Sequence, residues 1–216
     1  MFNNLVKLAL QENAENVKKR IEYLALHDST LRNWSTETRW NQYEAGTITK
    51  EQAVAYAAKR IAKDAEKRNT KTIAKIEKVA AAPDLQFITI NTWFTKSGSC
   101  HAEISTNTGR YSGVAHGYGY DKQSAAVAEC FNADPAILKV LYTLKENGIK
   151  AGKKKSAFGD NRDIIGYGAG YSEVPYFEGG VGIECFISIL KKAGYETRTT
   201  YGKNEMFYSV YKTSEN

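Results

Sequence analysis

The chain has 216 residues, of which 42% are hydrophobic and 25% are charged, and its formal net charge is +6. This length is enough for one well-packed domain with an extension, and the composition is that of an ordinary globular protein. The three cysteines, an odd number without metal-ligand spacing, argue for reduced thiols and against a disulfide framework. No stretch is apolar enough for a secretion signal or a membrane span, so we expect a soluble protein of the cytoplasm.

The positive charge is concentrated towards the N-terminus. Residues 1–83 carry 15 Lys/Arg against 10 Asp/Glu, residues 84–148 carry 5 against 6, and residues 149–216 carry 10 against 8. Such a basic segment attracts nucleic acid or an acidic partner, and the alternative is an ordinary solvated helix face.

Residues 1–48 predict an N-terminal helical arm. A helix is expected at 3–27, with one apolar face made of Leu5, Leu8, Val17, Ile21 and Leu24. A short helix is expected within 29–46, which Gly46 ends. Its anchors are expected to be Trp34, Trp40 and Tyr43.

A long amphipathic helix is predicted at 50–81. Thr49 and Gln52 form a capping-box pattern at its start, and Pro83 stops it. Its apolar positions recur at helical spacing as Val54, Ala58, Ile61, Ala65, Thr72, Ile76 and Val79. Its lysines fall on the opposite side and form a basic outer stripe, with Lys59, Lys63, Lys67, Lys71 and Lys75.

After this helix the chain becomes rich in β-branched and aromatic residues. Three strands are predicted within 84–117. A helix follows with Asp121 as its expected N-cap, and another begins at Asp134 and Pro135 and ends at Gly148.

The remaining chain is expected to hold a long loop at 149–180, an amphipathic helix at 181–194 and a closing hairpin. The predicted fold class is therefore α+β. It comprises the helical arm, a three-stranded antiparallel sheet packed by helices in a core over 49–148, and a C-terminal helix and hairpin within 149–216.

The stretch "GVAHGYGYDKQSAAVAECF" places Gly117 and Gly119 before a helix start, where free N–H groups bind anions and Lys122 adds positive charge. It lacks the third glycine of a dinucleotide-binding loop and the Lys-Ser/Thr pair of a nucleotide-binding loop. A sharp turn from strand to helix is the simpler interpretation.

Catalytic residue types are sparse. Cys100 and His101 adjoin on a predicted strand and so point to opposite faces, which leaves His116 as the histidine best placed for an enzyme site. The residue spacing predicts no metal site, no cofactor and no assigned catalytic group.

Further contact residues are candidates for nucleic-acid or partner binding. Lys153, Lys154, Lys155 and Arg162 lie in the expected loop and suit phosphate contact, or are simply solvated. The aromatic residues near one end of the sheet suit base stacking, or are partly core: Trp93, Tyr111, Tyr118 and Tyr120.

The order helix, three strands, helix across 50–132 resembles the double-stranded-RNA-binding domain. "GSCH" stands where that family has its Gly-Pro-x-His turn, and Gly119, Lys122 and Ala125 match its strand-end glycine and lysine-rich helix start. Two of the three family lysines that hold RNA phosphates are Gln123 and Ala126 here. The resemblance implies an RNA-binding fold with one of the three lysines retained.

The segments "YEAGTITKEQAVAYAAKR", "INTWFTKSGS", "GYGYDKQSAAVAECFN" and "PYFEGGVG" resemble accessory proteins of bacterial phages, plasmids and integrative elements. That resemblance implies an anti-defence protein of the anti-CRISPR type, which inhibits a defence ribonucleoprotein or nuclease by stoichiometric binding through a basic surface, with guide RNA or target nucleic acid as a further contact. A stand-alone RNA-binding module is the second hypothesis. A small-ligand-binding protein or enzyme built on the glycine-rich loops is the third.

Overall fold

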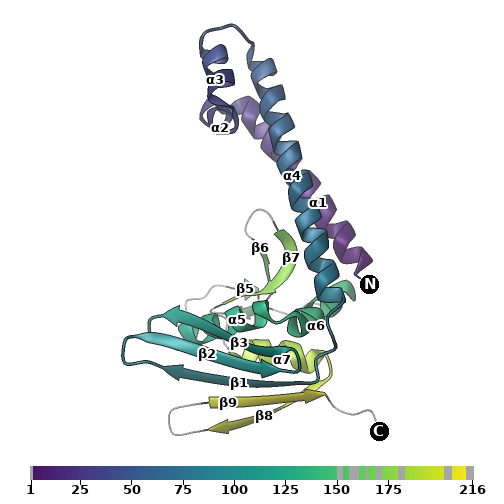
Figure 1. The fold of residues 1–216 in the computed structure, drawn as a ribbon, viewed down its shortest axis with the longest axis vertical. Coiled ribbons are helices and arrows are strands. Elements are labelled where there is room, and N and C mark those ends of the chain that lie inside the picture. The colour runs from purple at the N-terminus through teal and green to yellow at the C-terminus, as the bar shows by residue number, and fades with distance from the viewer. Residues whose placement is uncertain are drawn as a thin grey trace. The chain divides into compact units, whose positions relative to one another are not determined.

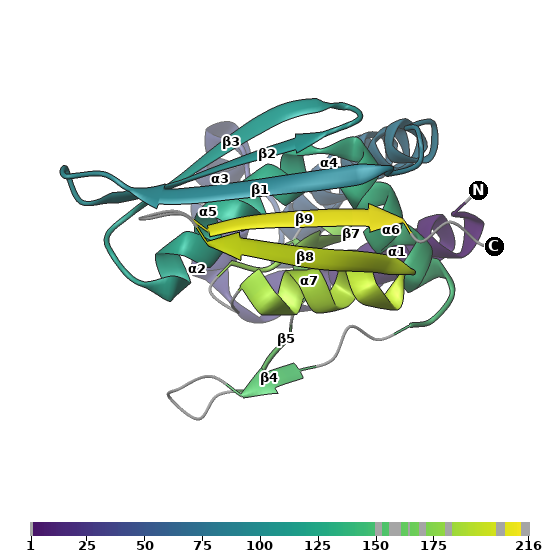
Figure 2. The same cartoon turned by 90° about the horizontal axis from the view of Figure 1, so that it is seen from below.

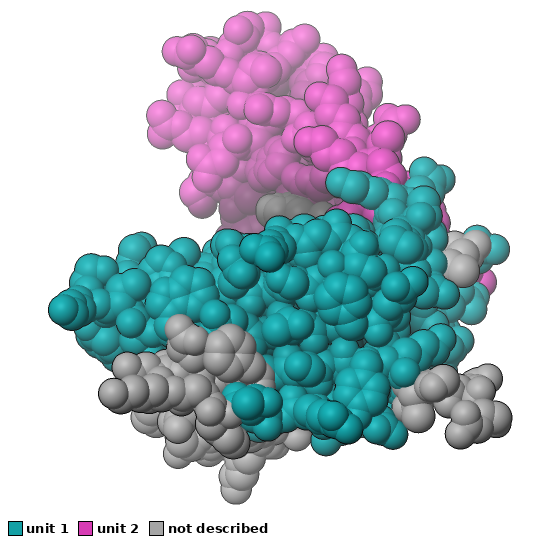
Figure 3. Space-filling model, turned by 60° about the horizontal axis from the view of Figure 1, so that its bottom comes forward, with its two compact units in different colours: residues 1–5, 76–168, 175–216 teal, residues 6–75, 169–174 magenta. Residues whose placement is uncertain are grey.

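The computed structural model describes residues 2–149, 153–155, 161–163, 165–168, 172–179, 183–201 and 206–212. The chain forms two compact units (Figure 3). The unit that we call the sheet unit comprises Met1–Leu5, Ile76–Gly168 and Pro175–Asn216. The helical unit comprises Val6–Lys75 and Ala169–Val174, so the division between the two units runs through a helix.

The helical unit is built from α1 (Asn3–Leu26), α2 (Asp28–Trp34), α3 (Glu37–Glu44) and most of α4 (Lys50–Ala80) (Figure 1). Its buried centre consists of Leu24, Leu31, Ala53, Ala57 and Ile61. The expected anchors Trp34, Trp40 and Tyr43 pack against this centre, which confirms their role.

Two expectations for this unit are wrong. The single short helix is in fact two, because Ser35 takes an extended conformation and Thr36 caps α3 by accepting a hydrogen bond from the Arg39 N–H. Leu8 is 45% exposed and does not belong to the buried face of α1. The polar Asn13 is buried instead, and its amide donates to the carbonyl oxygen of Ala65 and to the side chain of Asn69.

The sheet unit contains one five-stranded antiparallel sheet in the order β3-β2-β1-β9-β8. Its strands are β1 (Phe87–Phe94), β2 (Ser99–Thr106), β3 (Gly109–His116), β8 (Tyr195–Tyr201) and β9 (Met206–Lys212). The expected hairpin is confirmed, but the three-stranded sheet is wrong because β9 pairs with β1.

Burial explains why the hairpin joins the sheet. Val210 lies opposite Ile88, and Tyr208 lies opposite Ile90. All four side chains are at most 6% exposed, so β9 extends the apolar face that β1 already presents. This shared burial stabilises the five-stranded arrangement. Without β9, the backbone edge of β1 and the apolar side chains beside it would be exposed to water.

The helices of the sheet unit cover one face of the sheet. They are α5 (Tyr120–Ala133), α6 (Pro135–Glu146) and α7 (Ile183–Lys192), and all three lie behind the strands in Figure 2. The rings of Phe131, Phe177 and Phe186 pack together, with centroids 5.1–5.7 Å apart. Among the described residues of this unit, no helix lies against the other face of the sheet.

The ends of the two long helices also belong to the sheet unit. The Glu146 carboxylate accepts hydrogen bonds from the backbone N–H groups of Asn4 and Leu5, at 3.1 and 2.8 Å. These N–H groups lack partners within α1, so Glu146 acts as a cap supplied from a distant helix.

Residues 149–180 hold four short strands rather than a plain loop. Strands β4 (Lys153–Lys155) and β5 (Asn161–Asp163) pair antiparallel, and β6 (Ile165–Gly168) pairs with β7 (Ser172–Phe177). These strands are only three to six residues long and lie in a charged and glycine-rich sequence, too short for a clear apolar alternation to predict them.

Candidate nucleic-acid interface

Helix α4 carries the strongest basic feature of the described chain. The capping box is confirmed: the Thr49 N–H donates to Gln52 Oε1 at 2.9 Å, and the Gln52 N–H donates to Thr49 Oγ1 at 3.3 Å. These two bonds satisfy N–H groups that a helix start leaves without intrahelical partners. The helix then runs for 31 residues with nine Lys/Arg and four Asp/Glu.

The basic stripe comprises Lys59, Lys63, Lys67, Lys71 and Lys75, and all five residues are exposed. The buried series Ala53, Ala57, Ile61 and Ala65 also advances by four residues per step. Because both series advance by the same step, the angle between them around the helix axis stays constant. The lysines therefore lie on the side of α4 away from the buried residues.

The geometry of the stripe suits a chain of phosphates. Successive lysines are about 6 Å apart along the helix axis, and the stripe is about 24 Å long. None of the five lysines forms an ion pair with a residue in the described ranges. Partial desolvation lowers the pKa of Lys75, at the end of the stripe.

The glycine loop forms a turn between β3 and α5. Gly117 and Gly119 have φ angles of 108° and 116°, which favour glycine, and Gly119 is the N-cap of α5. The expected N-cap, Asp121, is therefore wrong, and this residue lies in the first turn of the helix. Lys122 packs its methylene groups against Gly117, and its Nζ lies 3.8 Å from Asp121 Oδ2. The side chain of Lys122 therefore makes contacts within the glycine loop and the first turn of α5.

The predicted stacking residues do not form one surface. Trp93 stacks on His101, with centroids 5.5 Å apart and planes 19° apart. Tyr118 instead lies 5.9 Å from Phe94, on the opposite side of β1, and its hydroxyl donates to the Thr95 carbonyl oxygen. Tyr111 donates from its hydroxyl to Thr108 Oγ1. The side chain of Tyr120 lies outside the described residues.

The remaining basic candidates lie on the β4–β5 pair. Lys153 and Lys155 flank Lys154, which is opposite Arg162 in the register. The side chains of these four residues lie outside the described part of the chain, so their contact role stays a prediction.

The histidine and cysteine candidates do not assemble into a nucleophilic site among the described residues. Cys100 is buried, and burial raises the pKa of its thiol, while His101 points to the other face of the sheet. His116 Nδ1 lies 3.3 Å from Ser99 Oγ, a cross-strand pair to which no described carboxylate is hydrogen-bonded. Within the described ranges, no group of three or more His, Cys, Asp or Glu residues is placed to hold a metal ion.

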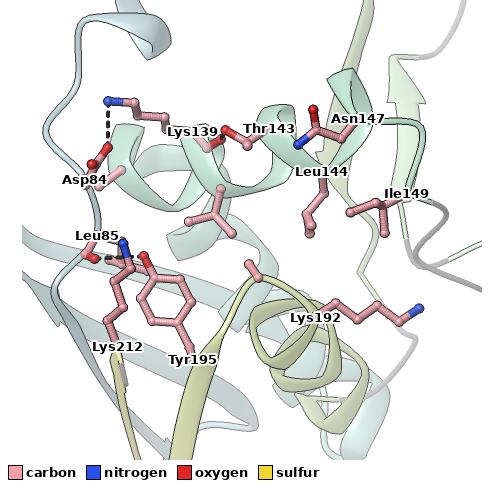
Figure 4. Close-up of a pocket in the computed structure, with 13 residues that line it drawn as sticks. Asp84, Leu85, Lys139, Thr143, Leu144, Asn147, Ile149, Lys192, Tyr195 and Lys212 are labelled. Atoms are coloured by element: carbon pink, nitrogen blue, oxygen red, sulfur yellow. Dashed lines mark hydrogen bonds and ion pairs between the residues drawn. The ribbon is translucent and has the colours of Figure 1, made fainter. Parts of the chain in front are cut away.

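A groove of about 360 Å³ lies beside α6, the end of α7 and the start of β8 (Figure 4). Lys139 and Asp84 pair at its rim with an N–O distance of 2.9 Å, and the Tyr195 hydroxyl donates to the Leu85 carbonyl oxygen. None of the glycine-loop residues lines this groove, so it is separate from the small-ligand site that the glycines suggested.

Comparisons with protein families, with curated proteins and with solved structures found no match. None of the described helices combines the length and apolar character needed to cross a membrane.

Proposed function

We propose that this protein binds nucleic acid, alone or within a nucleoprotein, through the basic stripe of α4. The supporting observation is that five exposed lysines without ion-pair partners among the described residues follow one another along α4. Lysines in such a line displace the condensed counterions of a phosphate backbone, and this release drives binding without sequence specificity.

The biological use that we propose is stoichiometric inhibition of a bacterial defence ribonucleoprotein or nuclease, within the host cytoplasm. The resemblance of four segments to accessory proteins of mobile elements supports this step. An inhibitor of this kind competes for guide or target nucleic acid, so the basic stripe would supply the electrostatic part of the contact.

The test compares two variants of equal charge change. Lys59, Lys63 and Lys67 are replaced by glutamine in one variant, and the exposed α1 lysines Lys7, Lys18 and Lys19 in the matched control. Fluorescence anisotropy with labelled duplex nucleic acid at low salt measures the affinity. We expect the stripe variant to lose most of its affinity and the control to keep it.

Inhibition is tested by titrating the protein into target cleavage by purified CRISPR effector ribonucleoproteins. For a sensitive effector, we expect target cleavage to reach its minimum when protein and effector are near equimolar. The stripe variant should leave cleavage unchanged. A protein that binds neither RNA nor DNA at low salt would contradict the proposed function.

A further inference from the structure

The face of the sheet opposite α5, α6 and α7 carries an ordered arrangement of side chains. Residues that are directly opposite in the strand register lie on the same face, so the pairing defines rows across the strands. Thr92 faces α5, because Gln123 of that helix donates to its hydroxyl. Its neighbours Asn91 and Trp93 consequently lie on the other face, which we call the open face.

Two aromatic pairs lie on the open face. One is the Trp93–His101 stack between β1 and β2. The other is Phe87 on β1, which is 43% exposed and lies opposite Tyr211 on β9. Phe87 and Trp93 are six residues apart on one strand, so the pairs are separated by about 20 Å.

A polar row crosses all five strands between the two aromatic pairs. The register places Arg198, Ser209, Thr89, Ser105 and Arg110 side by side in that order. The arginines at its two ends are exposed, and the Arg198 guanidinium lies 5.9 Å from the ring centroid of Tyr211. The three central residues present hydroxyl groups between them.

The charge on this face differs from the charge on α4. Glu103 and Glu196 lie on the open face together with Arg110 and Arg198, so the formal charges of these four residues balance. A face with balanced charge gains little from a duplex backbone. Its exposed Phe87 ring and Arg198 guanidinium, and the half-buried Trp93–His101 pair, instead offer planes on which unpaired bases stack.

We propose that the open face binds a short segment of single-stranded RNA. Unpaired bases stack on the Phe87 ring and Arg198 guanidinium at one end and on the Trp93–His101 pair at the other. The hydroxyl row lies beneath the sugars, where side-chain hydroxyls donate to and accept from the ribose 2′-OH. The site is in the sheet unit and does not depend on the basic stripe of α4.

Two phenylalanines on β1 provide a matched test. Phe87 is 43% exposed on the open face, and Phe94 is 45% exposed on the opposite face. The probe is a fluorescein-labelled oligouridylate of about six nucleotides, a length within the usual range for one such site. We expect Phe87→Ala in the full chain to weaken binding by about 5-fold to over 100-fold, the usual range for one lost stacking partner, and Phe94→Ala to leave it unchanged.

A second variant, Arg198→Gln, changes an exposed residue and so tests the proposal without changing the core. We expect this variant also to bind the oligouridylate more weakly. If Phe87→Ala and Arg198→Gln both leave the affinity for RNA unchanged, the proposal is overturned. That result is expected if the open face binds a protein instead. An equal loss in Phe94→Ala also overturns it, and equal affinity for the matching oligodeoxyuridylate overturns the assignment to RNA. The variant with Lys59, Lys63 and Lys67 replaced by glutamine distinguishes the two surfaces. Phe87→Ala should weaken RNA binding in that variant as much as in the unaltered protein, whether or not α4 contacts nucleic acid.

Discussion

Gly113 of β3 offers a sharp test of how the sheet and α5 fit together. A Cβ atom at this position would lie 2.1 Å from the Ala126 carbonyl oxygen and 2.9 Å from Glu129 Cβ. Contacts of a real Cβ atom essentially never fall below 3.0 Å, so Gly113→Ala must move β3 and α5 apart by about 1 Å. The obstacle is backbone, which cannot rotate away as a side chain can.

The expected loss of stability follows from two contributions. Overpacking of this kind costs about 3 kcal/mol. The separation also strains the hydrogen bond from the Val114 N–H to Glu129 Oε2, which is 2.9 Å long, and such a bond contributes about 1 kcal/mol. A total of roughly 3–4 kcal/mol raises the unfolded population of the sheet unit by about two to three orders of magnitude.

Thiol labelling measures this change in the sheet unit alone, because Cys100, Cys130 and Cys185 all lie there and are buried. The labelling rate at fixed low urea should rise by a similar factor in Gly113→Ala when opening is fast relative to labelling. Gly148→Ala is the control, since Gly148 has a φ of 69° and nothing within 4 Å of an added Cβ. Backbone strain alone costs about 1–2 kcal/mol there. A Gly113→Ala rate no higher than the control rate would refute the close approach of β3 and α5.

The remaining predictions concern buried polar groups and thiols. Asp134 is fully buried and accepts hydrogen bonds from the N–H groups of Ala136 and Ile137 and from two threonine hydroxyls. Asp134→Ala should therefore lower the free energy of unfolding by about 2–4 kcal/mol in urea titrations, and Asp134→Asn by clearly less, whereas an equal loss would contradict the capping role. Burial, with a smaller effect of the Glu129 charge, raises the pKa of the Cys130 thiol to about 12. The native protein should hence resist thiol reagents at pH 8 and react only on unfolding or as the pH approaches that pKa, and prompt labelling of Cys130 in native protein would be the contrary result.

Local signals explain which parts of the fold were predictable. The capping box at Thr49, the Asp134-Pro135 start of α6 and the apolar period of α4 each concern residues within a few positions of one another. Elements defined by such signals were expected close to their observed ends. Asp121 shows where such local signals fail. Gly119, with its positive φ, is the N-cap, so α5 begins at Tyr120 and Asp121 lies inside the helix.

Contacts between distant parts of the chain were not predictable. The pairing of β9 with β1 joins residues more than 100 positions apart, and only its register places Tyr211 beside Phe87. For that reason Trp93 was expected as a stacking residue, whereas Phe87, His101 and Arg198 were not. The basic stripe was visible because it depends on one helix, and the open face was not because it depends on five paired strands.

The most direct test of the proposed function is the slope of log Kobs against log salt concentration for binding to duplex DNA. Each lysine that contacts a phosphate adds about −0.9 to this slope. We predict that replacing Lys59, Lys63 and Lys67 with glutamine makes the slope shallower by about 3, and that the Lys7, Lys18 and Lys19 control leaves it unchanged. The same slope in the stripe variant and the unaltered protein would contradict the claim that α4 holds the nucleic acid.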